Sequence, residues 1–552
     1  MSPNHESIEV IPGTEILIQE DSARHAQQVC LVPQPSTHAE DPLNWAPKWK
    51  AMVIIVQAVF VFISVLTPLS IAPLTPIFIQ EFHTTLPKVN MLFGAAAMAL
   101  GYANFYIVPF ANIFGRRPTI LICGLICILA NIWQALVTSY DSFIGARVIS
   151  GLGAAANESI MPMVIADVMF IEHRGAWMGL YFYAYFLGTF IGPIISGGIA
   201  AHISWRWFFW VCTIAQGVNW IAMFFIFPET RYRRDHEIAS DSESSTDNTI
   251  NSKEKANGPQ IMTQTSTQIE SDAGPDDISQ VKTRVASPDI PLTTNENLGL
   301  GHPVRSQFSL IPKIEFDGAN ILFRDILAPI QIFTFPIICW VVFSFGFATN
   351  CLLALNLTQS QVFAAPPYLF TPDKVGFVNF AFVVGGIVGL TTAGPFSDWV
   401  SMRATKRNGG VREAEMRLIA LVPYIAICLV GMVVTAVGYQ RHWPWQAVVV
   451  VGYGFVGVEV VSIPAIIISY AVDSYKHLPG QIMVSATIVK NTFGFGMIFY
   501  FNDWAVRQGF IPPVMTIMAL AVGFTTIGMC IFLKWGKHFR RMTKDSKLHQ
   551  LI

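Results

Sequence analysis

Residues 181–201 read YFYAYFLGTFIGPIISGGIAA, an uncharged apolar run that small side chains interrupt at regular intervals. The small side chains recur every four positions, at Ala184, Gly188, Gly192, Ser196 and Ala200. On a helix this spacing places all five on one slowly drifting face. In water the run would make a poor helix, but in lipid such a face lets two helix backbones approach closely. The run therefore predicts a membrane-spanning helix with a packing face.

A proline lies inside the same run, and Gly197 follows it closely. Pro193 removes one backbone hydrogen bond and can kink the helix, which membrane helices tolerate where neighbouring helices cover the defect. Two interpretations are open for the stretch alone. It is either an ordinary tightly packed spanning helix or a helix whose close contact and kink serve a rocking motion between two halves. The rest of the chain favours the second.

The composition indicates a polytopic membrane protein. Of the 552 residues, 53% are hydrophobic and only 13% are charged, whereas soluble proteins carry about 25% charged residues. The formal net charge of -1 argues against a nucleic-acid partner. Most of the eight cysteines lie in apolar stretches without paired spacing, so we interpret them as small buried hydrophobic residues. We expect no enzymatic activity, no cofactor and no metal site.

Twelve apolar runs have roughly the 20-residue length that crosses a bilayer. They cover 51–79, 91–108, 119–137, 142–168, 176–200, 208–227, 331–355, 376–394, 417–438, 446–470, 481–501 and 512–533. Six runs precede a polar segment at 231–325 and six follow it. Twelve acidic and four basic residues lie between Asp235 and Leu300, so this segment cannot bury enough apolar surface to fold.

The predicted fold is an all-α membrane protein with 12 transmembrane helices in two parallel six-helix repeats. The expected parts are a disordered cytoplasmic tail at 1–50, a bundle at 51–230, a disordered cytoplasmic linker at 231–325, a second bundle at 326–535 and a basic cytoplasmic tail at 536–552. Within the linker, Ile311 to Leu327 becomes apolar again with interspersed charges. This stretch is either a short interfacial helix or plain loop.

Basic residues in the short connections predict the orientation. Nine lie on one predicted side and five on the other, and the basic C-terminal tail joins the richer side. By the positive-inside rule, both termini and the linker are expected in the cytoplasm. We expect a monomer in the lipid bilayer, of the plasma membrane or alternatively the vacuolar membrane, with a small-molecule substrate.

An internal repeat supports two equivalent halves. PFAN at 109–112 follows the second run, and PFSD at 395–398 follows the eighth. A parallel repeat predicts a binding site near mid-membrane between the halves. Small residues also recur every four positions in the eighth run, at Gly385, Gly389 and Ala393. We therefore expect the fifth and eighth helices to cross closely through their small-residue faces.

Ionisable side chains at membrane depth are costly, so each is a functional candidate. Arg147 and Glu158 share one face of the fourth run, about 16 Å apart along the axis. The small residues between them leave room for a cavity. Arg147 either couples to Glu158 or simply extends to the outer membrane boundary. Glu158 is either a proton carrier or a protonated structural carboxyl.

Two further ionisable residues lie in the second half. Glu459 in the tenth run and Lys490 in the eleventh are at similar depth, so the two are candidates for an ion pair. That pair is either purely structural or part of the coupling site. Uncharged polar side chains that are candidates for lining the substrate cavity are Asn104, Asn350, Asn379 and Asn491.

These motifs resemble those of the major facilitator superfamily. Gly188 to Gly197 resembles the GxxxGPxxGG signature in the fifth helix of its antiporters, with Ser196 replacing one glycine. RVISG at 147–151 resembles the fourth-helix motif, whose arginine is associated with proton coupling. Gly115–Arg117 and Gly394–Asp398 resemble the loop signature and its echo in the second half. The first copy has Asn112 where aspartate is usual, so the resemblance implies an acidic gating contact at Asp398 but not in the first half.

Other motifs resemble those of fungal drug:proton antiporters with twelve spans. They are DPLNW at 41–45, WRW at 205–207 and FPET at 227–230, and LVPQP at 31–35 with the long central loop suggests the yeast histidinol and polyamine transporter branch. The resemblance implies proton-coupled export of a small organic compound by alternating access. Alternatives are proton-driven uptake of an organic cation such as a polyamine, and, from another class, a transporter-like nutrient sensor.

Overall fold

The computed structural model describes residues 14–16, 35–36, 38–232, 299–309, 318–475 and 478–543. Most of the expected N-terminal tail, residues 233–298 of the expected linker and residues 544–552 of the basic tail lie outside the described residues. Within the described part, 12 helices are long and apolar enough to cross a membrane. The all-α prediction with twelve spans is therefore confirmed.

The first half contains six spans, four of which are continuous helices. A break divides the first span, a turn divides the fourth, and the fifth contains an internal proline. The spans are α1 (Pro47–Leu69) with the 3-10 helix η3 (Ala72–Leu74) and α2 (Thr75–Glu81), α3 (Leu86–Phe114), α4 (Arg116–Leu136), α5 (Tyr140–Ala154) with α6 (Ala156–Val168), α7 (Ile171–His202) and α8 (Trp205–Ile226).

The second half repeats this pattern and adds two π-helical turns, which commonly mark functional sites in helices. Its spans are α11 (Pro336–Phe363), α12 (Pro372–Phe377) with α13 (Phe380–Arg407), η6 (Ala414–Ala420) with α14 (Leu421–Gln440), α15 (Trp445–Ala447) with η7 (Val448–Tyr453) and α16 (Gly454–Ser474), α17 (Pro479–Gln508), and α18 (Ile511–Met518) with η8 (Ala519–Phe524) and α19 (Thr525–Met542).

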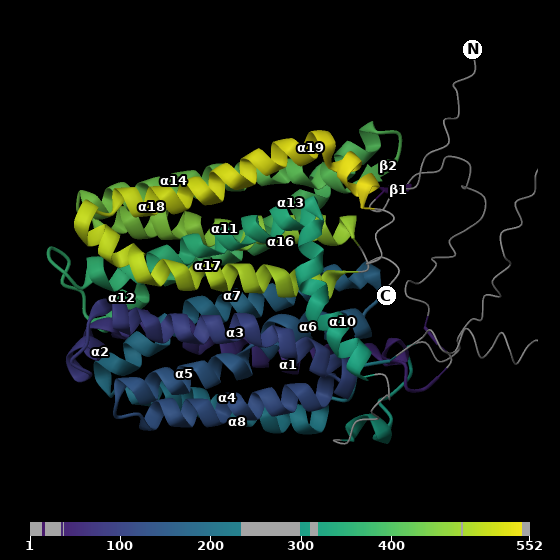
Figure 1. Ribbon diagram of the computed structural model, residues 1–552, viewed down its shortest axis with the longest axis horizontal. Coiled ribbons are helices and arrows are strands. Elements are labelled where there is room, and N and C mark those ends of the chain that lie inside the picture. The colour runs from purple at the N-terminus through teal and green to yellow at the C-terminus, as the bar shows by residue number, and fades with distance from the viewer. Residues whose placement is uncertain are drawn as a thin grey trace, which may run out of the picture.

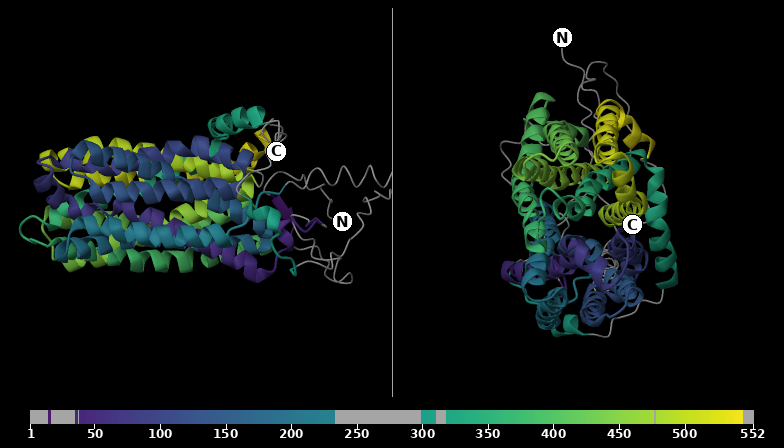
Figure 2. Two further views of the ribbon diagram at one scale, coloured as in Figure 1. Left: turned by 90° about the horizontal axis from the view of Figure 1, so that it is seen from below. Right: turned by 90° about the vertical axis from the view of Figure 1, so that its left-hand side faces the viewer.

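The two halves lie side by side as two bundles with their helices roughly parallel (Figures 1 and 2). Helix α1 begins and α19 ends at the same end of the molecule, as an even number of spans requires. We call this the terminal end, and the end that carries α2 and α12 the opposite end. The positive-inside prediction assigns the terminal end to the cytoplasm.

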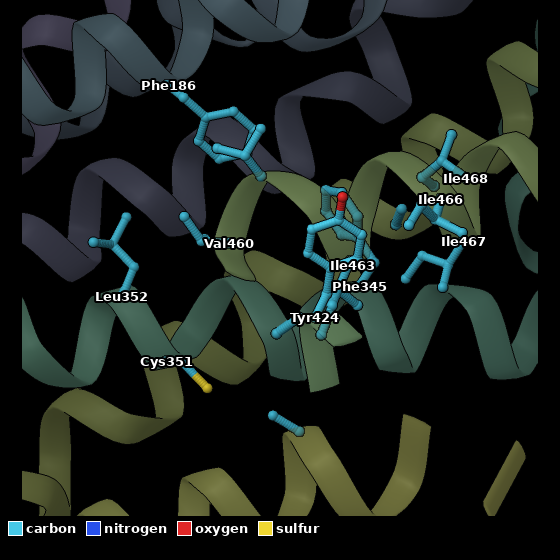
Figure 3. Close-up of a cluster of buried hydrophobic side chains, with 14 of the residues drawn as sticks. Phe186, Phe345, Cys351, Leu352, Tyr424, Val460, Ile463, Ile466, Ile467 and Ile468 are labelled. Carbon is cyan, nitrogen blue, oxygen red and sulfur yellow. The ribbon is translucent and has the colours of Figure 1, made fainter. Parts of the chain in front are cut away.

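A single buried cluster joins the two bundles. Figure 3 shows Phe345 and Leu352 of α11 against Val460 and Ile463 of α16, with Phe186 of α7 from the first half in the same cluster. Branched and aromatic side chains fill this contact, and the labelled residues of the second half are nearly or fully buried. The contact between halves is therefore apolar around the polar groups described below.

The small-residue face of α7 packs inside its own half. A side chain at Gly188 would lie 2.6 Å from the carbonyl oxygen of Phe62, and one at Gly192 would lie 2.3 Å from that of Leu66. One turn further on, the Ser196 hydroxyl donates to the carbonyl of Ser70 over 2.6 Å. The α7 face thus follows the backbone of α1 at matching four-residue steps.

The second small-residue face also has a partner in its own half. Gly385 and Gly389 of α13 lie against the carbonyl oxygens of Gly454 and Val458 of α16, at 2.1 and 2.7 Å from an added side chain. The predicted crossing of the fifth and eighth helices through these two faces is therefore wrong. A four-residue spacing shows that a backbone approaches closely, but any neighbouring helix can be the partner.

The fifth and eighth spans do meet, but elsewhere. Gly197 of α7 lies against the backbone of α12, where an added side chain would be 2.5 Å from the carbonyl oxygen of Pro372. In return, Gly376 of α12 lies against the carbonyl of Pro193. Nearer the middle, Phe190 stacks on Phe382 with ring centroids 5.6 Å apart. The close backbone contact between halves is thus at the opposite end.

The N-terminal segment before α1 is folded in part, which corrects the expectation of a disordered tail to residue 50. Asp41 caps the 3-10 helix η2 (Pro42–Asn44) by accepting a hydrogen bond from the Leu43 amide over 2.9 Å. Trp45 is fully buried. The backbone amide of the next residue, Ala46, donates to the Gly301 carbonyl over 2.8 Å. DPLNW is therefore a structural motif that anchors the start of α1.

The described end of the expected linker is also folded. The 3-10 helix η4 (Arg305–Phe308) packs on the first half, where the Glu229 amide donates to the Gln307 carbonyl over 2.8 Å. After residues outside the description, α10 (Gly318–Gln331) forms a helix. The helical alternative for this stretch is thus confirmed from Gly318 onward. A short strand, β1 (Thr14–Ile16), pairs antiparallel with β2 (Val411–Glu413).

Candidate functional site

The fourth span positions Glu158 through its break. Helix α5 ends at Ala154, and α6 begins at Ala156 with Glu158 in its first turn. The positive end of the dipole of a helix that starts at mid-span favours a carboxylate in its first turn. Pro162, four residues later, has no N–H to donate to the Glu158 carbonyl. The local sequence thus concentrates polar groups around Glu158, which is 2% exposed.

Glu158 makes an ion pair with the second half. The Lys490 ammonium of α17 lies 2.6 Å from Glu158 Oε1. The Tyr185 hydroxyl of α7 donates to the same oxygen over 2.7 Å, and Lys490 Nζ donates to the Tyr185 hydroxyl over 2.8 Å. We call these three residues the charged triad. It is a closed set of hydrogen bonds that joins the two halves.

One carboxylate oxygen of the charged triad is not used by it. Glu158 Oε2 is buried and accepts no hydrogen bond from the described residues. The Lys490 ammonium lies 5.1 Å from the centre of the Tyr185 ring, on the side of its hydroxyl group. The triad therefore holds a primary ammonium between a carboxylate and a phenol hydroxyl, with one acceptor oxygen left over.

The charged triad lines a cavity of about 110 Å³ between the halves. All three members contribute to its wall. Aromatic and aliphatic side chains form most of the rest, and uncharged polar residues complete the wall. The aromatic residues are Phe93, Tyr181, Phe182, Phe186 and Phe345, and the additional polar ones are Thr189, Thr349, Asn350, Thr487 and Asn491. A mostly apolar pocket with few polar groups is typical of a small-molecule site.

The predicted Glu459–Lys490 pair is wrong, because Lys490 pairs with Glu158. Glu459 is fully buried inside the second half, and neither carboxylate oxygen has a hydrogen-bond partner among the described residues. Its carboxylate and the sulfur atoms of Cys351 and Cys428 lie within 4.8 Å of one another. This group has the donor types of a soft metal site, but it does not line the cavity. Matching depth in two helices did not show which way each side chain points.

Arg147 lies away from the charged triad and is fully buried, so the alternative in which it extends to the membrane boundary is wrong. Its guanidinium donates to the carbonyls of Thr67 and Pro68, at 3.1 and 2.8 Å, where α1 ends within the first span. It also donates to the Leu92 carbonyl and to the Gln134 side chain. Arg147 therefore satisfies backbone carbonyls that the broken helix leaves unpaired.

The four candidate asparagines divide between two environments. Asn350 and Asn491 line the cavity, whereas Asn104 and Asn379 lie outside its lining. Asn350 also donates to the Lys490 carbonyl over 3.1 Å, which fixes α17 against α11 beside the triad. Asn104 donates to a carbonyl of its own helix, and Asn379 donates to Gln359 near the opposite end.

Asp398 lies at the terminal end of α13. It pairs with Arg417 over 3.2 Å, and Arg417 also pairs with Asp473 at the end of α16 over 3.1 Å. Arg417 therefore links Asp398 of the loop signature to Asp473 of the tenth span, within the second half. It holds the terminal ends of the eighth, ninth and tenth spans together.

Tyr185 was absent from the site candidates drawn from the sequence. Its signal was the aromatic stretch from Tyr181 to Phe186, which a lipid-facing or core stripe explains equally well. The pairing of Glu158 with Lys490 was also missed, because the two residues are separated by 332 positions and by the contact between halves. Fold-level packing brings them together.

Curated relatives extend over nearly the whole chain. An uncharacterized MFS-type transporter of Schizosaccharomyces pombe is 25% identical over 97% of this chain and 94% of its own length. Protein HOL1 of Saccharomyces cerevisiae is 24% identical over 98% of this chain and 97% of its own. The probable efflux pump mfs2 of Aspergillus flavus is 21% identical over 86% of this chain and 99% of its own.

A solved structure shows the same fold. The xylose transporter XylE of Escherichia coli, in a partially occluded inward-open conformation, matches with a TM-score of 0.54 and 11% identity, over 88% of this chain and 98% of its own. The family model of the Major Facilitator Superfamily matches residues 54–499, from the first span through the charged triad to the end of the eleventh. The chain therefore belongs to the Major Facilitator Superfamily and is a multi-pass secondary transporter of that type.

Proposed function

We propose that this transporter couples proton movement to the export of a small organic compound that carries a positive charge. The observation that carries the proposal is the charged triad, in which Glu158 of one half binds the Lys490 ammonium of the other inside the cavity. Because this ion pair joins the two halves, a change in the charge of either member alters how strongly the halves attract each other.

The Lys490 ammonium occupies the place that a substrate cation would take. Glu158 supplies the negative charge, and the Tyr185 hydroxyl supplies a hydrogen-bond acceptor at 2.8 Å. A cationic substrate competes with Lys490 for Glu158, while the aromatic lining covers its apolar part. A proton on Glu158 has the same effect on the ion pair, because it removes the negative charge that Lys490 needs. Substrate and proton therefore exclude each other at one carboxylate, which is the requirement for exchange.

Export is the proposed direction because of two likenesses. The fifth-helix stretch at 188–197 resembles the antiporter signature, and the Aspergillus flavus relative is described as a probable efflux pump. Proton-driven uptake of an organic cation is the second candidate. The same observation supports it, since a carboxylate paired with an ammonium suits a cation whichever way it moves.

The test uses Glu158→Gln, which keeps an acceptor oxygen for Lys490 but cannot titrate. Purified protein in proteoliposomes is assayed with labelled spermidine, a linear polyamine, and with ethidium, a planar aromatic cation. We expect the variant to retain counterflow exchange and to lose accumulation driven by a proton gradient. The sign of the gradient that drives accumulation distinguishes export from uptake.

Glu459→Gln is the matched control, because Glu459 is also a buried carboxylate of a spanning helix but does not line the cavity. We expect it to accumulate both probes as the unaltered protein does. Accumulation that persists in Glu158→Gln and disappears in Glu459→Gln would move the coupling role to Glu459. No movement of any organic cation in either direction would favour the nutrient-sensor alternative.

A further inference from the structure

The two halves differ in one acidic residue at the terminal end. In the second half, Asp398, Arg417 and Asp473 form an acid–arginine–acid chain. In the first half, Arg116 pairs with Asp167 at the end of α6 over 3.0 Å, which matches the pair of Arg417 with Asp473. The position that corresponds to Asp398 carries Asn112, an amide without charge.

Helix α10 brings a carboxylate to this amide. Asn112 Nδ2 donates to Asp325 Oδ2 over 2.6 Å, while Asn112 Oδ1 accepts from Arg116 Nη1 over 3.0 Å. Asp325 is 4% exposed, so this contact is shielded from water. The acid–arginine–acid chain of the first half is thus completed through an amide by a residue that lies outside the six spans.

The same helix contacts the second half. The Ser485 hydroxyl of α17 donates to the Pro329 carbonyl of α10 over 2.9 Å, and both Ala328 and Ser485 are buried. Helix α10 packs on α3 and on α17, the two spans that meet along one side of the contact between halves. Figures 1 and 2 show α10 crossing from one bundle to the other at the terminal end.

We propose that Asp325 is a positioning residue of the transport cycle, which supplies the carboxylate that Asn112 lacks and so holds α10 across α3 and α17 at the terminal end in the state described. The halves cannot separate there unless α10 leaves one of its two partners. The bond to Asn112 is a single charge-assisted hydrogen bond. It is strong enough to bias the equilibrium between open and closed ends and weak enough to break in each cycle.

Hydrogen–deuterium exchange on the full chain in lipid nanodiscs tests this role. In Asp325→Asn we expect about tenfold faster exchange in α10 and in the terminal ends of α3 and α17, because a hydrogen bond to a charged group becomes a weaker neutral one. Peptides of α2 and α12 at the opposite end, which is closed in this state, should not exchange faster. Faster exchange at both ends would indicate general loss of structure and would overturn the proposal.

A double variant supplies the rescue. Asn112→Asp alone places two carboxylates together and should also release α10. Asn112→Asp with Asp325→Asn exchanges the two groups and keeps one amide and one carboxylate, so unaltered exchange should return. Asp503→Asn, at an exposed carboxylate of α17, is the control and should exchange as the unaltered protein does. A double variant that stays as fast as Asp325→Asn, or an Asp325→Asn that exchanges normally, contradicts the assignment.

Discussion

At the scale of single residues, the stability of the charged triad depends on the balance between the desolvation of two ions and their attraction. Removing Glu158 and Lys490 from water costs several kcal/mol for each ion, and their attraction offsets this only while both partners are present. The Tyr185 hydroxyl contributes a further hydrogen bond to each. The pair is therefore sensitive to the loss of one member and tolerant of the loss of both.

We predict that Lys490→Met lowers the free energy of unfolding by roughly 3 kcal/mol, the low end for a buried pair, because 12% of the Lys490 side chain is exposed. The double variant Glu158→Gln with Lys490→Met should recover most of this loss, because it leaves no buried charge alone. Thermal unfolding of the purified protein in detergent measures both. Equal losses in the single and double variants would show that the ion pair contributes nothing.

A second prediction concerns the fully buried Arg147, whose planar guanidinium donates in four directions. Lysine keeps the charge but cannot reach all four acceptors with one ammonium. Arg147→Lys should therefore leave buried carbonyls unpaired and cost about 3 kcal/mol of stability. Unfolding in detergent again provides the measurement, and a variant as stable as the unaltered protein would mean that the carbonyls need no guanidinium.

The sequence predicted functional residues best where a single side chain is energetically costly to place in a membrane. Glu158, Lys490 and Glu459 were candidates because a charge in a spanning helix needs a reason to be there. Their partners did not follow, since a hydropathy pattern gives depth along a helix and leaves rotation about its axis open. Asn104 and Asn379 were misplaced for the same reason.

At the scale of helices, the four-residue spacing of small residues determines which backbones can approach. The α7 face at Gly188 and Gly192 meets α1, while Gly198 on the same helix has no atom within 4 Å of an added side chain. This contrast within one helix separates the effect of crowding from that of helix propensity.

We expect Gly192→Ala to cost roughly 1–3 kcal/mol, because its methyl group would lie 2.3 Å from the Leu66 carbonyl oxygen. Gly198→Ala should be neutral or stabilising, by up to about 1 kcal/mol, since alanine is the better helix former. The melting temperatures of the two variants in detergent give the comparison. A Gly192→Ala protein as stable as Gly198→Ala would show that α7 and α1 are less closely packed than described.

The number and order of the spans could be read from the sequence, because a bilayer requires about 20 apolar residues for each crossing. The breaks in the first, fourth and eighth spans could not. The break in the first span depends on carbonyls being satisfied by a distant group, as Thr67 and Pro68 are by Arg147. The partner of each small-residue face also required the three-dimensional packing.

At the scale of the whole molecule, contacts between the two halves close the opposite end in the state described. The Ser360 hydroxyl of α11 donates to the Ala72 carbonyl of η3 in the other half, and Gly197 of α7 lies on α12 nearby. Movement of the halves must break these contacts before the cavity can open at that end.

Deleting 240–298 should leave transport unchanged, since a polar acidic segment adds no apolar core. Extending the deletion through Phe308 should lower the amount of folded protein, because it removes Gly301 and Gln307, which hold Ala46 and Glu229. Counterflow exchange and the yield of monodisperse protein are the two measurements. Loss of folding in the shorter deletion would contradict the assignment of its residues as dispensable.

Because Asn44 and Ala46 bond to Gly301, the chain is attached to the first bundle on both sides of the long acidic segment. The chain leaves the first bundle after α8 and returns to it at residues 299–309, so the segment is a closed excursion from one bundle. Only residues 310–317 lie between that attachment and α10, and a chain of that length reaches at most roughly 28 Å. Changing the length of 233–298 therefore alters a loop-closure entropy, while the covalent link between the two bundles runs through the short stretch and α10.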